Sequence, residues 1–236
     1  MARLQSFPAG GVAVVFGGGG GIGAALLAAL RNDGGFDDVI TFGRTSSPPV
    51  DILEDSSLQR AGQVAARAGE IRLVIDATGF LHDDQQEPEK SWRQLDAQNL
   101  ARSFALNAIA PALMMKHMLP LIPRSGKAVF ATLSARVGSI EDNRLGGWYA
   151  YRSSKAALNQ LVRTASIELR RRCPEAICVA LHPGTVATGL SAPFSSAGLE
   201  VHSPAVAAGH LLSVIDALGP EGNGGFFDWR GETVPW

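Results

Sequence analysis

Short, largely apolar runs alternate along the chain with longer stretches that mix apolar and polar residues. The apolar runs cover residues 12–16, 39–42, 48–52, 71–75, 128–133, 177–181 and 225–228. Runs of this length predict strands, and their nearly continuous hydrophobicity is typical of strands that are buried on both faces of a parallel sheet.

The stretches between these runs repeat apolar residues at spacings of three and four, which is the pattern of a helix that packs one face. The first predicted helix begins at Ala24, and the others cover 56–68, 99–119, 150–172 and 204–218. Pro111 lies inside the third of them and should bend it or sit at a kink. Residues 83–90 are polar and are predicted as an exposed loop or the entry to a helix.

Strands and helices alternate throughout, with no repeat, linker or break in composition. This order predicts one α/β domain over residues 1–236, a doubly wound parallel sheet with helices on both faces and right-handed crossovers. Ligands of such sheets bind beyond the carboxyl ends of the strands. The residues that follow these ends are Gly17, Arg44, 76–79, Ser134 and 182–188, so one edge of the sheet should carry the site.

Glycines occupy positions 17 to 21 and 23, between the first strand and the first helix. A strand, a glycine turn and a helix let the backbone approach a phosphate and aim helix N–H groups at it. Three registers fit: Gly17-x-x-x-Gly21-x-Gly23, Gly18-x-Gly20-x-x-Gly23 and Gly17-x-x-Gly20-x-x-Gly23. The glycines therefore predict a phosphate-bearing cofactor without distinguishing a dinucleotide from another nucleotide.

The second predicted strand ends in Phe42-Gly43-Arg44-Thr45. In a dinucleotide-binding unit a carboxylate at this point binds the ribose 2′-hydroxyl of NAD, whereas an arginine accommodates the 2′-phosphate of NADP. Since no carboxylate is present, Arg44 favours NADP over NAD.

Tyr151 and Lys155 are four residues apart on a predicted helix and therefore share a face. A nearby ammonium stabilises a phenolate, so Lys155 should lower the pKa of Tyr151 toward neutrality. A phenol of this kind can exchange a proton with an oxygen in carbonyl–alcohol chemistry.

The formal net charge of −1 gives no general attraction to nucleic acid or to an anionic membrane. The two cysteines, Cys173 and Cys178, are predicted to be free thiols in a reducing compartment. Glycines interrupt the apolar stretch 9–30 that could otherwise imitate a signal peptide, and the chain is expected to be cytoplasmic. The five histidines lack the spacing of metal ligands, so no metal is expected.

Taken together, the glycine turn and the Tyr151-x-x-x-Lys155 pair resemble the short-chain dehydrogenase/reductase family over essentially the whole chain. The resemblance selects the register Gly17-x-x-x-Gly21-x-Gly23 and implies a Rossmann fold with NAD(P) as cofactor. By position in the family's motifs, the implied cofactor contacts are Gly17, Gly21, Ile22, Gly23, Arg44, Asp51, Ile52, Ala77, Thr78, Gly79, Tyr151, Lys155, Pro183, Gly184, Val186 and Thr188. The chain departs from the common pattern at two positions: Phe16 stands where the family often has Thr, and Thr78 stands where it usually has Ala.

The same resemblance implies a catalytic set of Asn107, Ser134, Tyr151 and Lys155. Tyr151 would be the general acid, Ser134 would donate a hydrogen bond to the substrate oxygen, Lys155 would bind the nicotinamide ribose and Asn107 would support a proton path through water. Ser134 precedes Tyr151 by 17 residues, which is longer than usual in the family, so Ser139 is the alternative serine.

More narrowly, residues 133–140 and the C-terminal stretch 227–236 resemble the C-factor-like and carbonyl reductase branch of the family. The implied function is interconversion of a carbonyl and an alcohol by hydride transfer with NAD(P), and NADPH-dependent reduction of a small-molecule carbonyl is favoured. One alternative is an NAD(P)-binding signalling protein with little turnover. Another, an epimerase or dehydratase with tightly held NAD, is disfavoured because few residues follow Thr188.

The substrate loop is expected at about 189–203. Residues beside the motifs that could line a substrate pocket are Phe80, Leu81, His82, Arg136, Trp148, Leu190 and Phe194. The helices at 99–119 and 150–172 resemble the pair through which this family forms dimers and tetramers, so a homodimer or homotetramer is expected.

Overall fold

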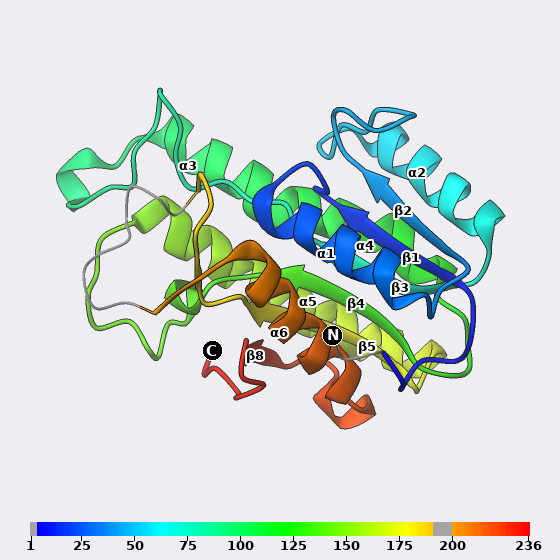
Figure 1. Cartoon of the computed structure of the whole chain (residues 1–236). Coiled ribbons are helices and arrows are strands. Elements are labelled where there is room, and N and C mark those ends of the chain that lie inside the picture. Colours follow the sequence, from blue (N-terminus) through cyan, green and yellow to red (C-terminus); the bar gives the residue numbers. More distant parts are fainter. Residues whose placement is uncertain (1–3, 191–199) are drawn as a thin grey trace.

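The computed structural model describes residues 4–190 and 200–236. Its central sheet has six strands, all parallel, in the order β2–β1–β3–β4–β5–β8. The strands are β1 (Val12–Phe16), β2 (Asp38–Phe42), β3 (Ile71–Asp76), β4 (Ala128–Leu133), β5 (Ala176–His182) and β8 (Phe226–Asp228). The predicted α/β class with a parallel, doubly wound sheet is confirmed (Figure 1).

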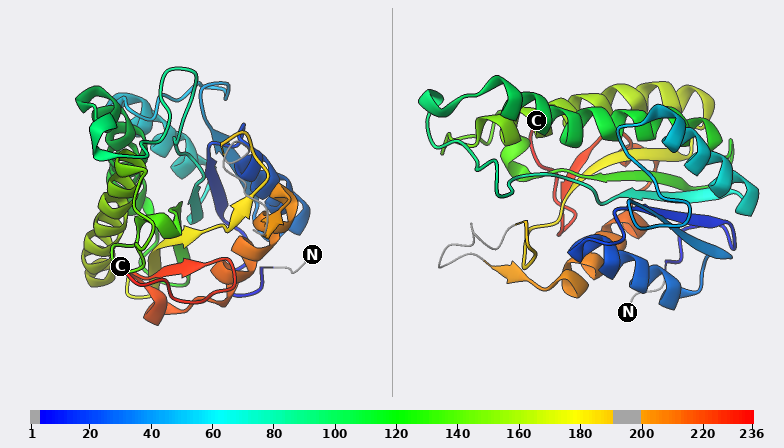
Figure 2. Two further views of the ribbon diagram at one scale, coloured as in Figure 1. Left: turned by 90° about the vertical axis from the view of Figure 1, so that its left-hand side faces the viewer. Right: turned by 90° about the horizontal axis from the view of Figure 1, so that it is seen from above.

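Helices cover both faces of this sheet, as the two views of Figure 2 show. The helices are α1 (Gly21–Asp33), α2 (Asp55–Ala68), α3 (Ala97–Phe104), α4 (Ala110–Met118), α5 (Tyr149–Arg172) and α6 (Pro204–Ala217). Helices α1 and α6 pack together on one face, and α2, α4 and α5 lie on the other.

Alternation along β1 explains the two layers. Val14 points into the core beneath α2, α4 and α5, where it joins Leu58 and Leu158. Val15 points the opposite way, into the core beneath α1 and α6, with Leu26. All of these side chains are fully buried, which is why the strand reads as a continuous apolar run rather than an alternating one.

The predicted strand at 48–52 is wrong. Residues 43–54 form a loop, closed where the Val50 N–H donates to the Gly43 carbonyl at 2.9 Å. Pro48 and Pro49 have no N–H to contribute to a ladder, which disfavours a strand inside a sheet. A small two-stranded sheet that the apolar pattern did not predict joins β6 (Thr185–Val186) to β7 (Val201–His202).

The predicted helix at 99–119 is interrupted. A π-helical segment, Ala105–Ile109, separates α3 from α4, and Pro111 is the second residue of α4, directly after that segment. Within the described residues, the run Ala97–Leu121 is the one helical stretch long and apolar enough to cross a membrane. It packs against α5, and the core helix of a soluble protein passes the same test.

Candidate active site

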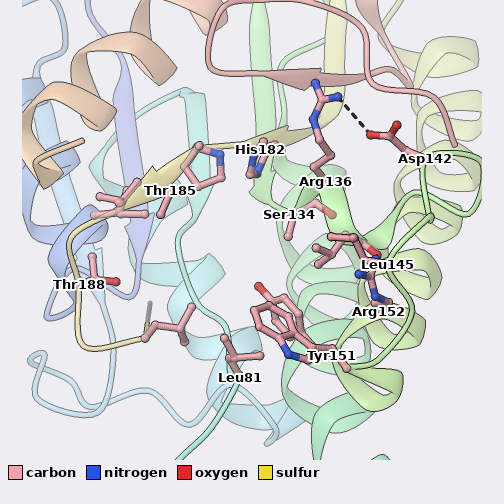
Figure 3. Close-up of a pocket in the computed structure, with 18 of the residues that line it drawn as sticks. Leu81, Ser134, Arg136, Asp142, Leu145, Tyr151, Arg152, His182, Thr185 and Thr188 are labelled. Carbon is pink, nitrogen blue, oxygen red and sulfur yellow. Dashed lines mark hydrogen bonds and ion pairs between the residues drawn. The ribbon is translucent and has the colours of Figure 1, made fainter. Parts of the chain in front are cut away.

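A cavity of about 720 Å³ opens where β4 and β5 end. It brings together Ser134 from the end of β4, Tyr151 from α5, and the segment from Pro183 to Val186 that follows β5. Figure 3 shows Tyr151 reaching into this cavity from α5, with Ser134 and His182 across from it. The predicted edge of the sheet therefore does carry the site.

The structure separates the two candidate serines. Ser134 lines the cavity beside Tyr151. Ser139 does not; its hydroxyl donates to the Trp236 carbonyl at 3.3 Å and accepts from the Asp142 N–H at 3.1 Å. Of the two serines, Ser134 is thus the one that shares the cavity with Tyr151.

A left-handed turn positions Tyr151. Gly146, Gly147 and Trp148 have φ values of 64°, 65° and 52°, and α5 begins at the next residue. The two glycines adopt this conformation without strain, whereas Trp148 does so at a cost. The turn places the Trp148 ring edge-to-face with Tyr151 at 6.2 Å between centroids. The Arg152 Nε holds the turn by donating to the Gly146 and Gly147 carbonyls at 3.2 and 3.0 Å.

The polar loop at 83–90 is not wholly exposed as predicted. Glu89 is buried, and its carboxylate accepts a hydrogen bond from the Ala150 N–H at 3.1 Å, at the start of α5. Gln86 is also buried and donates to the Ser103 hydroxyl at 3.0 Å. A carboxylate at a helix N-terminus satisfies a free N–H group and interacts favourably with the helix dipole.

Lys155 is buried under the end of β4. Its ammonium donates to the Leu133 carbonyl at 2.8 Å and lies 5.9 Å from the centre of the Tyr151 ring. Burial lowers the pKa of Lys155 to about 8, although the carboxylate of Asp76 opposes that shift. Lys155 and Asn107 both lie close to Gly79: a Cβ there would be 3.6 Å from Lys155 Nζ and 3.7 Å from Asn107 Oδ1.

The predicted lowering of the Tyr151 pKa is wrong for this structure, because burial raises the pKa of that phenol to about 12. The Lys155 ammonium lies over the ring and is bonded to a carbonyl, so desolvation of the phenolate dominates. At neutral pH Tyr151 therefore carries its proton.

Asn107 lies in the π-helical segment and is fully buried. Its Oδ1 accepts from the Phe80 N–H, and its Nδ2 donates to the Phe80 carbonyl, both at 2.8 Å. Nδ2 also donates to the Ser154 hydroxyl at 3.1 Å. Asn107 thus fastens the backbone after β3 to α5, beside Lys155. π-Helical turns of this kind occur frequently at functional sites.

The structure fits a dinucleotide at the predicted glycine turn. Gly17 has a φ of +82°, and a Cβ at Gly23 would overlap the Gly17 carbonyl, so both positions require glycine. No side chain caps the N-terminus of α1, which leaves its N–H groups available to a phosphate. A Cβ at Gly21 would lie 2.8 Å from Thr188, so the turn meets the Pro-Gly segment.

The adenosine side of the predicted cofactor site is also assembled at this edge. Arg44 is exposed immediately after β2, whose Phe42 carbonyl accepts from the Gly17 N–H at 2.9 Å. Thr78 is held by Asp76, which accepts from its N–H at 2.9 Å and its hydroxyl at 2.6 Å. Asp51 and Ile52 lie in the loop before α2, and the Asp51 carboxylate accepts from the Leu53 N–H at 2.9 Å.

Four of the predicted pocket residues line the cavity: Leu81, Arg136, Trp148 and Leu190. Phe80 and His82 are not among its lining residues, and Phe194 lies outside the described residues, as does most of the predicted substrate loop. His182, from the predicted stretch 182–188, lines it too, whereas sequence patterns missed Arg144, Leu145 and Arg152. Arg136 is paired with Asp142 at 3.1 Å and with Asp228 at 3.3 Å. In the described part of the chain no three His, Cys, Asp or Glu side chains are placed to hold a metal ion.

Comparison with known proteins assigns the family. Residues 22–211 match a family model described as enoyl-(acyl carrier protein) reductase. The chain is 32% identical to the 1-hydroxy-2-glutathionyl-2-methyl-3-butene dehydrogenase of Rhodococcus sp. (strain AD45) over 214 residues, which are 91% of this chain and 89% of that protein. The chain is a short-chain dehydrogenase/reductase.

This short-chain dehydrogenase/reductase is also 41% identical to the C-signal protein of Myxococcus xanthus over 143 residues, 60% of this chain and 81% of that one. Its fold matches the NADPH-bound carbonyl reductase from chicken fatty liver with a TM-score of 0.83, covering 98% of this chain and 97% of that one at 24% identity. The predicted family, the single-domain Rossmann fold and an NAD(P)-dependent oxidoreductase activity are thereby confirmed.

Proposed function

We propose that the protein reduces the carbonyl group of a small molecule to an alcohol with NADPH. The observation that carries the proposal is the cavity in which Tyr151 and Ser134 face the segment after β5, at the same sheet edge as the glycine turn. A carbonyl oxygen placed between these two hydroxyl groups would receive a proton and a hydrogen bond where negative charge develops.

Different residues of the chain would bind the cofactor and transfer the proton. When bound, the cofactor would supply the hydride to the carbonyl carbon. Gly17, Gly21 and Gly23 would hold its diphosphate, and the segment Pro183–Thr188 would hold its nicotinamide end. Tyr151, with a pKa of about 12, keeps its proton at neutral pH and would deliver it to the carbonyl oxygen. Lys155 and Asn107, which both lie close to Gly79, would support the path through water by which a replacement proton reaches Tyr151.

The two tyrosines of the chain give a matched test of this mechanism. Tyr151→Phe should lower turnover by a factor on the order of 10² or more, because it removes the proton donor, while NADPH affinity stays nearly unchanged. Tyr149→Phe is the control, since Tyr149 opens the same helix without lining the cavity. Steady-state rates and a fluorescence titration measure both quantities. A Tyr151→Phe variant with wild-type turnover would remove Tyr151 from the mechanism.

Arg44 is the proposed determinant of the cofactor. Arg44 is exposed just after β2, where the 2′-phosphate of NADP would lie, and residues 42–45 include no carboxylate. Arg44→Gln should weaken NADPH binding about tenfold or more and leave NADH binding unchanged. Arg67→Gln, at the exposed end of α2, is the control. Equal affinity of the wild type for the two cofactors would overturn the NADP preference, and binding of neither would overturn the oxidoreductase proposal.

A signalling role with little turnover is the second candidate, and the identity to C-signal is what favours it. It would leave cofactor binding intact in the Tyr151→Phe variant and would show no carbonyl reduction by the wild type. We further propose that the protein is cytoplasmic and forms a homodimer or homotetramer through the outer faces of α4 and α5.

A further inference from the structure

Ser134 has a partner that the mechanism above does not use. Its hydroxyl donates to Asn159 Oδ1 at 2.7 Å, and both side chains are buried. Asn159 lies on α5 one turn after Lys155 and two turns after Tyr151, so the same helix face carries all three. Asn159 stands behind Ser134 and does not line the cavity.

A serine hydroxyl has one proton and can accept further hydrogen bonds. While Ser134 donates that proton to Asn159, it offers the cavity only its lone pairs. In this state it cannot donate a hydrogen bond to a substrate oxygen. A carbonyl oxygen has no proton to give, so Ser134 must turn its own proton toward the cavity to assist reduction.

The other end of the Asn159 amide is unengaged. Its Nδ2 is buried and has no hydrogen-bond partner among the described residues. Half a turn of the amide would therefore break no hydrogen bond other than the one to Ser134. In the turned orientation Nδ2 would donate to the Ser134 oxygen, and the Ser134 proton would be free for the substrate.

We propose that Asn159 is a positioning residue that sets the direction of the Ser134 proton. With its oxygen toward Ser134, the amide holds the serine proton away from the substrate. With its N–H toward Ser134, it leaves that proton free to be donated to the substrate oxygen, in reduction and in oxidation alike. This inference rests on the proposed carbonyl–alcohol function.

Asn159→Asp tests the inference, because an ionised carboxylate accepts and cannot donate. In that variant the Ser134 proton is held by the carboxylate, so kcat for carbonyl reduction should fall at least tenfold at high pH, with little change in NADPH affinity. Protonation of the new carboxyl restores a donor, so the reduction rate should recover as pH falls through one added ionisation. Alcohol oxidation passes through the same transition state, in which Ser134 donates to the substrate oxygen, so it should slow in the same pH range.

Two variants separate this effect from loss of packing. Asn159→Leu keeps the volume, adds no ionisable group and should show no added ionisation. Asn223→Asp is the matched control, because Asn223 is a buried asparagine whose Oδ1 accepts from the Cys178 N–H at 2.9 Å and whose Nδ2 donates to the Ser166 carbonyl at 3.0 Å. It should lose stability and keep the wild-type pH profile. A wild-type pH profile in both directions for Asn159→Asp would overturn the inference.

A second measurement does not depend on activity or on the Asp variant folding. The side-chain amide signals of Asn159 in a ¹H–¹⁵N spectrum, assigned by their absence from Asn159→Leu, should shift in Ser134→Ala, whereas those of Asn223 should not. Unshifted Asn159 signals would overturn the inference whatever the turnover. A wild type that binds NADPH but reduces no carbonyl would instead count against the proposed function.

Discussion

At the scale of single residues, burial decides the protonation states in the site. Tyr151 and Lys155 lie one turn apart, yet the pKa of the phenol rises to about 12 and that of the ammonium falls to about 8. Each group is pushed toward its neutral form, which is the effect of desolvation rather than of mutual attraction. A neutral phenol is a proton donor, so this environment suits reduction of a carbonyl.

Lys155 should therefore link stability to pH. Its pKa is lower in the folded chain than its ordinary value of 10.5, so the unfolded chain binds more protons between pH 8 and 10.5. The free energy of unfolding of the wild type should thus increase, relative to that of Lys155→Met, as pH rises through this window. Urea titrations of both proteins at pH 7 and pH 10 measure the difference. A difference that does not change with pH would contradict the lowered pKa.

At the scale of elements, irregular segments place the functional groups. The glycine turn brings the backbone of α1 onto β1, the left-handed turn before α5 aims Tyr151, and the π-helical segment holds Asn107 against Phe80. Each departs from regular geometry where a functional residue must be placed, whereas β1 with β2 and β4 with β5 pair in unbroken register.

Alanine substitutions at two helical glycines, Gly23 and Gly209, test whether the glycine turn requires a residue without a side chain. Gly23→Ala would force a Cβ onto the Gly17 carbonyl, so NADPH affinity should fall at least tenfold and the free energy of unfolding should drop by about 1–3 kcal/mol. Gly209→Ala, in α6, meets no atom within 4 Å and should stabilise the protein by roughly 0.5–1 kcal/mol. Thermal unfolding and cofactor titration compare them. Normal NADPH binding by Gly23→Ala would contradict the close approach.

At the scale of the whole molecule, the parallel sheet gathers residues from distant parts of the chain. All six strands point the same way, so the turns after β1, β3, β4 and β5 meet at one edge. The outer faces of the helices expose large apolar side chains. Ile109, beside α4, and Ile167, on α5, are 51% and 49% exposed, which suits helices that pack against a second copy of the chain.

The proposed oligomer gives the prediction at this scale. Ile109→Glu combined with Ile167→Glu should lower the molar mass measured by light scattering, because charges on a helix-to-helix interface oppose association. Leu53→Glu, at a comparably exposed apolar position before α2, is the control and should leave the mass unchanged. A wild type that is already monomeric would exclude the oligomer.

The sequence by itself determined the elements and the kind of chemistry. Local periodicity predicts strands such as Val12–Phe16 and the helix Tyr149–Arg172. The glycine turn and the Tyr151–Lys155 pair are also local patterns, and they indicate a phosphate-bearing cofactor and carbonyl–alcohol chemistry from the sequence alone. The prediction failed at 48–52, where two prolines removed the N–H groups that an apolar pattern does not count.

Only the tertiary structure decided how these groups are tuned. Whether Ser134 or Ser139 faces Tyr151 depends on where the loop after β4 runs, and the Glu89 bond to Ala150 joins residues 61 positions apart. The pKa of Tyr151 depends on burial by side chains from several elements, so its direction could not be read from the spacing to Lys155. Sequence patterns record periodicity within one element, whereas burial and the partner of a hydroxyl are properties of elements packed together.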